Sequence, residues 1–157
     1  MYRFVASILL VIPWLTASIT SNNVDPKDIV LIEGRRYYFG STLEVTVPEA
    51  LSVCQEINMT LSGLETLEEF TAVTNYMQTN LNLGLLWWTS GCRQSTSWIW
   101  SNTGQSFTYF KWDTAYGDPT ITDVRTQGCL YVYDVTGLMR DNWCEINHNF
   151  ICEERSC

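Results

Sequence analysis

The 157-residue sequence contains little positive charge and a single histidine, His148. Nine lysines and arginines stand against seventeen aspartates and glutamates, which gives a formal net charge of −8. Nucleic-acid backbones and anionic membrane surfaces repel a protein of this charge, so we expect neither as a partner. A lone histidine and the absence of a Gly-x-Ser-x-Gly motif argue against a hydrolytic triad. We therefore expect no enzyme activity, and we expect His148 to lie at the surface.

The sequence also lacks an apolar run long enough to span a membrane. A spanning helix needs about 20 apolar residues, whereas the longest run here covers residues 4–15. Arg3 precedes this run and small residues follow it at positions 16–18, which is the pattern of a cleaved secretory signal peptide. We therefore expect residues 1–18 to be removed and the product to be secreted and extracellular.

Cysteines at metal-binding spacing are absent as well. None of the cysteines takes part in a Cys-x-x-Cys or Cys-x-x-His pair; they occupy positions 54, 92, 129, 144, 152 and 157. In an oxidising compartment such cysteines form disulfides rather than zinc sites. Their spacing alone leaves the pairing open.

The apolar pattern predicts two helices early in the chain. The first opens at Thr46, with Glu49 completing a capping-box sequence, and it ends at Asn58, which tolerates a left-handed backbone. The second opens at Thr66 with the same spacing to Glu69. Helical spacing predicts the buried faces, which are Ala50, Val53, Cys54 and Ile57 in the first helix and Leu67, Phe70, Val73 and Met77 in the second.

Segments rich in β-branched and aromatic residues predict strands, at 35–39, 85–89, 98–100, 107–110, 130–133 and 149–152. The order of strand, helix, helix and then several strands predicts an α+β fold, in which two helices pack on short antiparallel sheets. Residues 111–128 form a long loop, and loops of this length often carry function. We place the domain at 34–154, after a lead-in at 19–33 that ends in an apolar strand and before a tail at 155–157 that carries Cys157.

In this order, the elements resemble a C-type lectin-like domain from about Arg35 to Glu154. The motifs that carry the resemblance are Tyr37-Tyr38, Ala50-x-x-x-Cys54, Leu61-x-x-Leu64, Trp88-Thr89-Ser90-Gly91, Trp98, Trp100, Trp112, Gly117-Asp118-Pro119-Thr120, Cys129, Gly137-Leu138-Met139-Arg140-Asp141, Cys144 and Cys152. Trp88-Thr89-Ser90-Gly91 and Thr103-Gly104-Gln105 are most similar to small secreted arthropod members, for which immune recognition and reproductive secretion are both common roles. The resemblance implies a disulfide-stapled fold with the bonds Cys54–Cys152 and Cys129–Cys144.

Sugar-binding members of this family hold a calcium ion in the long loop and the strand beside it, and the sugar joins the ion's coordination shell. Calcium prefers six to eight oxygen ligands, several of them charged. The matching positions in this chain, which the resemblance implies as the ligand site, are Asp118, Pro119, Thr120, Gln127, Arg140 and Asp141. Only Asp141 keeps its acid unchanged, so the resemblance implies a degenerate calcium site.

Arg140 replaces a neutral oxygen ligand with a guanidinium, which has no acceptor atom. A positive charge about 4 Å from a divalent cation costs roughly 8 kcal/mol at an effective dielectric near 20. We therefore predict that Arg140 pairs with Asp118 or Asp141 in place of the ion and that no calcium is needed. The alternatives are a weak residual calcium site, or calcium held elsewhere by loop acids such as Asp113 and Asp123.

Four further residues are candidates for contacts or modification. Trp143, next to Cys144, is a candidate for stacking on a ligand. Asn58 begins a glycosylation sequon, Asn58-Met59-Thr60. Cys92 and Cys157 lie outside the four family cysteines, and they could bond within one chain or link two chains into a dimer.

These observations predict a secreted module that recognises a carbohydrate or protein ligand through residues 111–128 and the strand near 139–143, with no cofactor. Two alternatives stay open. One is a calcium-dependent carbohydrate-binding lectin, and the other is a disulfide-linked structural or scaffolding subunit.

Overall fold

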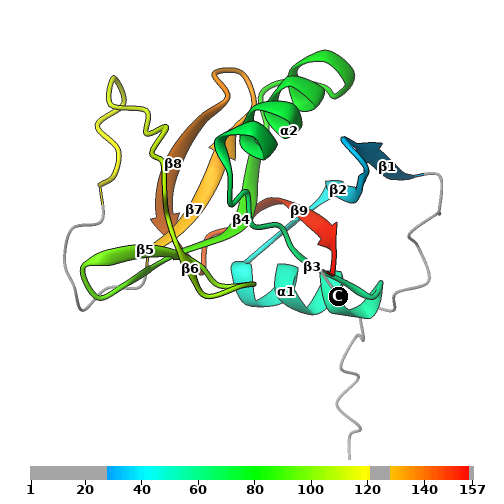
Figure 1. Cartoon of the computed structure of the whole chain (residues 1–157), viewed down its shortest axis with the longest axis horizontal. Coiled ribbons are helices and arrows are strands. Elements are labelled where there is room, and N and C mark those ends of the chain that lie inside the picture. The colour runs from blue at the N-terminus through cyan, green and yellow to red at the C-terminus, as the bar shows by residue number, and fades with distance from the viewer. Residues whose placement is uncertain (1–27, 121–127, 156–157) are drawn as a thin grey trace, which may run out of the picture.

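The structure is a computed structural model, and it describes residues 28–120 and 128–155. These ranges contain two helices and nine strands (Figure 1). In chain order they are β1 (Ile29–Ile32), β2 (Arg35–Val45), α1 (Val47–Glu56), β3 (Met59–Leu61), α2 (Leu67–Asn80), β4 (Leu86–Gln94), β5 (Ser97–Trp100), β6 (Gln105–Ser106), β7 (Gly128–Tyr133), β8 (Leu138–Trp143) and β9 (His148–Glu154). The α+β fold predicted from the sequence is confirmed.

The strands join into one branched sheet rather than separate antiparallel sheets. The main order is β1-β2-β9-β4-β5-β6, with β3 paired to β9, and with β7 paired to both β4 and β8. Every pair is antiparallel except β4 and β9, which run parallel over Trp87 and Trp88. The last strand of the domain therefore lies in the middle of the sheet, between β2 and β4.

Two adjacent tryptophans on β4 face opposite sides of the sheet, because side chains alternate along a strand. Trp87 belongs to the buried cluster beneath α2, and its Nε1 donates to Asp134 Oδ2 at 3.0 Å. Trp88 belongs to the cluster beneath α1, and its Nε1 donates to the carbonyl oxygens of Val45 and Ile146. The two helices thus cover different faces of the sheet, as Figure 1 shows.

The first helix begins as predicted. The Thr46 hydroxyl accepts a hydrogen bond from the Glu49 amide, and the Glu49 carboxylate accepts one from the Thr46 amide, which completes the capping box. Asn58 follows the helix with a φ of 59°, in the left-handed region that asparagine tolerates. Cys54 lies on the buried side of α1 and forms a disulfide with Cys152 of β9.

The second helix departs from the prediction at its first turn. Thr66 caps α2 by accepting a hydrogen bond from the Glu69 amide. The Glu69 side chain does not return to Thr66, because it accepts hydrogen bonds from the Glu65 amide, from Arg35 and from Tyr37 instead. Leu67, which we expected to be buried, is 39% exposed.

Two more predictions from the sequence are wrong. Residues 107–110 do not form a strand, because Phe107 turns inward and stacks on Trp100 with ring centroids 4.1 Å apart. His148 is buried rather than at the surface, and its ring lies 4.6 Å from that of Trp88. No helix among the described residues is long and apolar enough to cross a membrane.

Candidate functional site

The first part of the long loop is held against β8 by backbone hydrogen bonds. Met139 donates to the carbonyl oxygen of Lys111 at 2.8 Å, and Asp113 donates to that of Met139 at 2.9 Å. This pairing brings Asp113 and Asp118, from the loop, beside Arg140 and Asp141, from β8. The Cys129–Cys144 disulfide closes the far end of the β7–β8 hairpin.

Arg140 lies at the centre of this group and has two acidic neighbours. Its Nη2 and Nε donate to Asp113 Oδ2 at 2.7 and 3.0 Å, and its Nε lies 3.9 Å from Asp118 Oδ2. Its guanidinium also lies over two aromatic rings, 3.9 Å from the centroid of Tyr116 and 4.6 Å from that of Tyr133. The principal partner is therefore Asp113, which the sequence analysis considered only as a loop acid that could hold calcium elsewhere, and Asp118 is the secondary one.

Asp141 and Asp118 hold the end of the described loop. The amide and hydroxyl of Thr120 donate to Asp141 Oδ1 at 2.6 and 3.2 Å, and the amide of Asp141 donates to Asp118 Oδ1 at 3.4 Å. Asp118 Oδ2 is buried and accepts no hydrogen bond from the described part of the chain. Burial, together with the neighbouring Asp141 carboxyl, raises the pKa of Asp118 to about 6.

The remaining predicted site residues are Pro119, Gln127 and Trp143. Pro119 follows Asp118 through a cis peptide bond, and Gln127 lies outside the described residues. Trp143 is 53% exposed at the end of β8, and Tyr116, which the sequence did not single out, is 66% exposed. Two exposed aromatic rings on the loop and on β8 are thus accessible to a ligand.

The candidate modification sites stay predictions. Asn58 is exposed at the exit of α1, as a glycosylation site must be. Cys92 is a half-buried free thiol on β4, and burial raises its pKa. Cys157 and Asp123 lie outside the described residues. The disulfide role of Cys157 and the calcium role of Asp123 therefore stay predictions.

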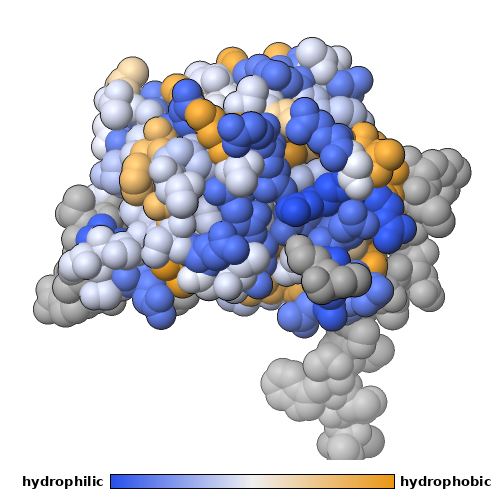
Figure 2. All heavy atoms as spheres, in the orientation of Figure 1, coloured by the Kyte–Doolittle hydropathy of each residue, from blue (hydrophilic) through white to orange (hydrophobic). Residues whose placement is uncertain are grey.

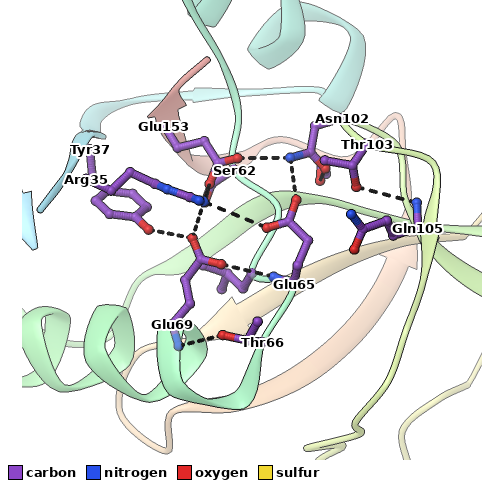
Figure 3. A network of polar contacts seen from close by, with 12 residues as sticks. Arg35, Tyr37, Ser62, Glu65, Thr66, Glu69, Asn102, Thr103, Gln105 and Glu153 are labelled. Atoms are coloured by element: carbon purple, nitrogen blue, oxygen red, sulfur yellow. Dashed lines mark hydrogen bonds and ion pairs between the residues drawn. The ribbon is translucent and has the colours of Figure 1, made fainter. Parts of the chain in front are cut away.

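A second group of charged residues lies away from the loop, and sequence reasoning missed it. Glu65, Glu69 and Glu153 place carboxylate oxygens within 4.8 Å of one another. Arg35 Nη1 lies among them, 2.6 Å from Glu69, 3.5 Å from Glu153 and 3.9 Å from Glu65 (Figure 3). Asn102 donates to both Glu65 and Glu153, at 2.8 and 2.9 Å.

Burial and mutual repulsion raise the pKa values of two acids in the second group. Burial, reinforced by the charges of Glu65 and Glu69, raises the pKa of Glu153 to about 8. Burial also raises the pKa of Glu65. The one signal in the sequence was an acid directly after Cys152, at the end of a predicted strand. Arg35 already supplies a positive charge here, so the group forms an internal ion-pair network that ties β2, β9 and the start of α2 together.

Comparison with known proteins identifies the fold. No protein-family model matches the sequence, and no curated protein matches it. Among solved structures, the mouse scavenger receptor C-type lectin carbohydrate-recognition domain matches with a TM-score of 0.65 and 22% identity, over 85% of this chain and 98% of that one.

Two further solved structures are a lectin domain in complex with a glycan and an antifreeze protein. The C-type lectin domain of murine dendritic cell inhibitory receptor 2, in complex with an N-glycan, matches with a TM-score of 0.67 and 17% identity, over 85% of this chain and all of that one. A calcium-independent type II antifreeze protein matches with a TM-score of 0.63 and 21% identity, over 85% of this chain and 96% of that one. The chain therefore has the C-type lectin-like fold.

Proposed function

We propose that this protein is a secreted, non-enzymatic binding module that recognises a carbohydrate or protein ligand without calcium. The recognition surface comprises residues 111–128 and β8. The observation that carries the proposal is the position of Arg140, whose guanidinium pairs with Asp113 at 2.7 Å and lies 3.9 Å from Asp118. The Arg140 guanidinium thus places a positive charge among the acids that a calcium ion would need as ligands.

The oxygen donors of this site do not fit calcium. Asp141 Oδ1 and Asp118 Oδ1 accept backbone hydrogen bonds that hold the loop. Asp118 Oδ2 has no hydrogen bond but faces the Arg140 guanidinium. An ion bonded to that oxygen at about 2.4 Å would stand within roughly 6 Å of Arg140 Nε, which gives a repulsion of roughly 5 kcal/mol or more at an effective dielectric near 20. Arg140 instead donates charge-assisted hydrogen bonds to Asp113 and lies 3.9 Å from Asp118, so its charge stabilises these acids without an ion.

Structures similar in fold support a carbohydrate ligand and calcium independence separately. One holds an N-glycan, and another is a calcium-independent antifreeze protein. Exposed Tyr116 and Trp143 offer aromatic faces on the proposed surface, and such rings contribute to both sugar and protein contacts. Catalysis has no support, because no nucleophile and base come together in the described site.

A glycan array probed with the labelled protein, in calcium and in EDTA, tests this proposal. We expect any glycan signal to be equal in the two buffers and to fall in Tyr116→Ala and Trp143→Ala. Leu31→Ala, which removes an exposed side chain of β1 at the opposite end of the molecule from residues 111–120 (Figure 1), is the matched control. A signal that EDTA abolishes would establish the calcium-dependent alternative. If no glycan binds in either buffer, the carbohydrate branch of the proposal fails and a protein ligand remains.

A further inference from the structure

A groove runs between the β1–β2 turn and α2, at the opposite end of the molecule from residues 111–120 (Figure 1). It consists of two adjoining hollows, of about 210 and 390 Å³, that share Glu33, Glu68 and Ala72. The first hollow reaches Ile32 and Val73, and the second follows α2 past Leu67. The groove therefore extends over roughly two turns of the helix.

The walls of the groove combine apolar and acidic side chains. Ile32, Ala72 and the exposed Leu67 supply the apolar surface, and Glu33 and Glu68 supply carboxylates. The described part of the chain gives neither carboxylate a hydrogen-bond or ion-pair partner. On the right of Figure 2, where Figure 1 places β1, hydrophobic surface likewise borders hydrophilic surface. Both acids are exposed and free to meet a cation.

The floor of the groove adds to its negative potential. Arg35 lines the first hollow, but it already contacts the carboxylates of Glu65, Glu69 and Glu153. Even with one of these acids protonated, the group has more negative than positive charge. Acidic walls above an acidic floor concentrate the field and favour a cation in the hollow.

Glu33 adopts a backbone conformation that is unusual for its side chain. Its φ is 48°, and the following Gly34 has a φ of 86°, so the two residues form a turn that asparagine and glycine favour. A glutamate at the first position is less stable there than asparagine. Glu33 lines both hollows from this turn.

We propose that this groove binds a lysine-bearing segment of a protein partner. The aliphatic stem of the lysine lies on Ile32 and Ala72, and its ammonium group meets Glu33 and Glu68. Long basic side chains bind in this manner, with an apolar stem along apolar surface and a charged head at its edge. A second copy of this chain is the wrong occupant, because its net charge of −8 would repel the groove.

Nuclear magnetic resonance titration with a short peptide tests the proposal. The probe is acetyl-Leu-Lys-Leu-amide, and the matched neutral peptide carries norleucine in place of lysine. We expect the amide signals of Glu33, Glu68 and Ala72 to shift with the lysine peptide, with a millimolar dissociation constant. The Glu33→Gln/Glu68→Gln double variant should bind about fivefold more weakly, as expected for two exposed ion pairs.

The controls separate local charge from net charge. Glu56→Gln/Glu145→Gln removes two exposed acids elsewhere and should bind the lysine peptide as the wild type does. Equal binding of the norleucine peptide, or equal weakening in the two double variants, would overturn the proposal. So would a titration to about 10 mM peptide that shifts no amide in the groove, since this reaches beyond the millimolar range expected.

Discussion

Arg140 illustrates how one residue can change the chemistry of a loop. It is held by two hydrogen bonds to Asp113 and by the rings of Tyr116 and Tyr133. A guanidinium is suited to this place because it is planar, permanently charged and able to stack on aromatic rings. The Arg140 guanidinium thereby supplies a fixed positive charge within the loop, and the loop acids need no bound calcium ion.

Replacing Arg140 with asparagine should create calcium binding. The variant supplies a neutral oxygen and leaves Asp113, Asp118 and Asp141 without the guanidinium, so we expect a lower melting temperature that CaCl₂ partly restores. Binding to the folded state alone stabilises it by RT ln(1 + [Ca²⁺]/Kd). Thermal unfolding with and without calcium measures this, with Arg36→Asn as the control because Arg36 is exposed and pairs with Glu154. If calcium has the same effect on both variants, Arg140 does not block the site.

Glu153 should make stability fall as the pH rises. Its pKa is about 8 in the folded protein, against an ordinary value of 4.5, because it is buried beside Glu65 and Glu69. Between these values the folded state keeps a proton that the unfolded state has released. The contribution is therefore complete below about pH 4.5 and is lost as the pH rises through about 8.

Urea unfolding of Glu153→Gln between pH 5 and pH 9 measures this effect. We expect the free energy of unfolding of the wild type to fall by a few kcal/mol over this range, and that of the variant to fall less. Glu44→Gln, at an exposed position, should follow the wild type. Parallel curves for the wild type and Glu153→Gln would show that Glu153 is ionised in the folded protein.

Single residues were predictable where a family motif covered them. The resemblance drew attention to Arg140, Asp118 and Asp141, and the structure does bring these residues together. It could not indicate Asp113 as the main partner, because that depends on how the loop runs beside β8. The Arg35 and Glu153 pair, 118 positions apart, has no local sequence pattern at all.

At the scale of single elements, the start of α1 depends on its reciprocal cap. Thr46→Ala removes the hydroxyl that accepts from the Glu49 amide, so we expect a loss of about 1 kcal/mol in the free energy of unfolding. Urea unfolding measures it, with Gln55→Ala as the control because Gln55 is exposed on the same helix. An equal loss in the two variants would mean that the cap contributes nothing beyond helix propensity.

Helices were more predictable than strands for a physical reason. Thr-x-x-Glu sequences mark a helix start through contacts within four residues, so both starts were found. Strands require partners from distant sequence, so the aromatic run at 107–110 indicated burial but not backbone pairing. The exposure of Leu67 has a similar cause, because the apolar spacing of α2 does not show where the sheet beneath it ends.

The whole molecule depends on a disulfide that joins α1 to the central strand β9. Cys54 and Cys152 are 98 positions apart, and both are fully buried. Removing both with alanine should cost about 2–5 kcal/mol, because the unfolded chain gains the freedom of a large loop. Urea unfolding measures the loss, and Cys92→Ser, which alters a free thiol, should lie close to the wild type. A loss no greater in the double variant than in Cys92→Ser would contradict this role.

The order of elements predicted the α+β class, and the resemblance implied the C-type lectin-like fold. The branched sheet with its parallel β4–β9 pair was not predictable, because pairing between the last strand and the middle of the chain leaves no local pattern. The groove beside β1 was also hidden, since it forms only when a turn and a helix meet. The two surfaces at opposite ends of the molecule thus follow from tertiary packing.

The central claim is that a guanidinium holds the loop in place of calcium. Calorimetric titration of the wild-type protein with CaCl₂ at neutral pH tests it most directly. We predict no saturable heat up to about 5 mM, above the range in which extracellular calcium modules bind. One-to-one binding in that range, abolished by both Asp118→Asn and Asp141→Asn, would contradict the account.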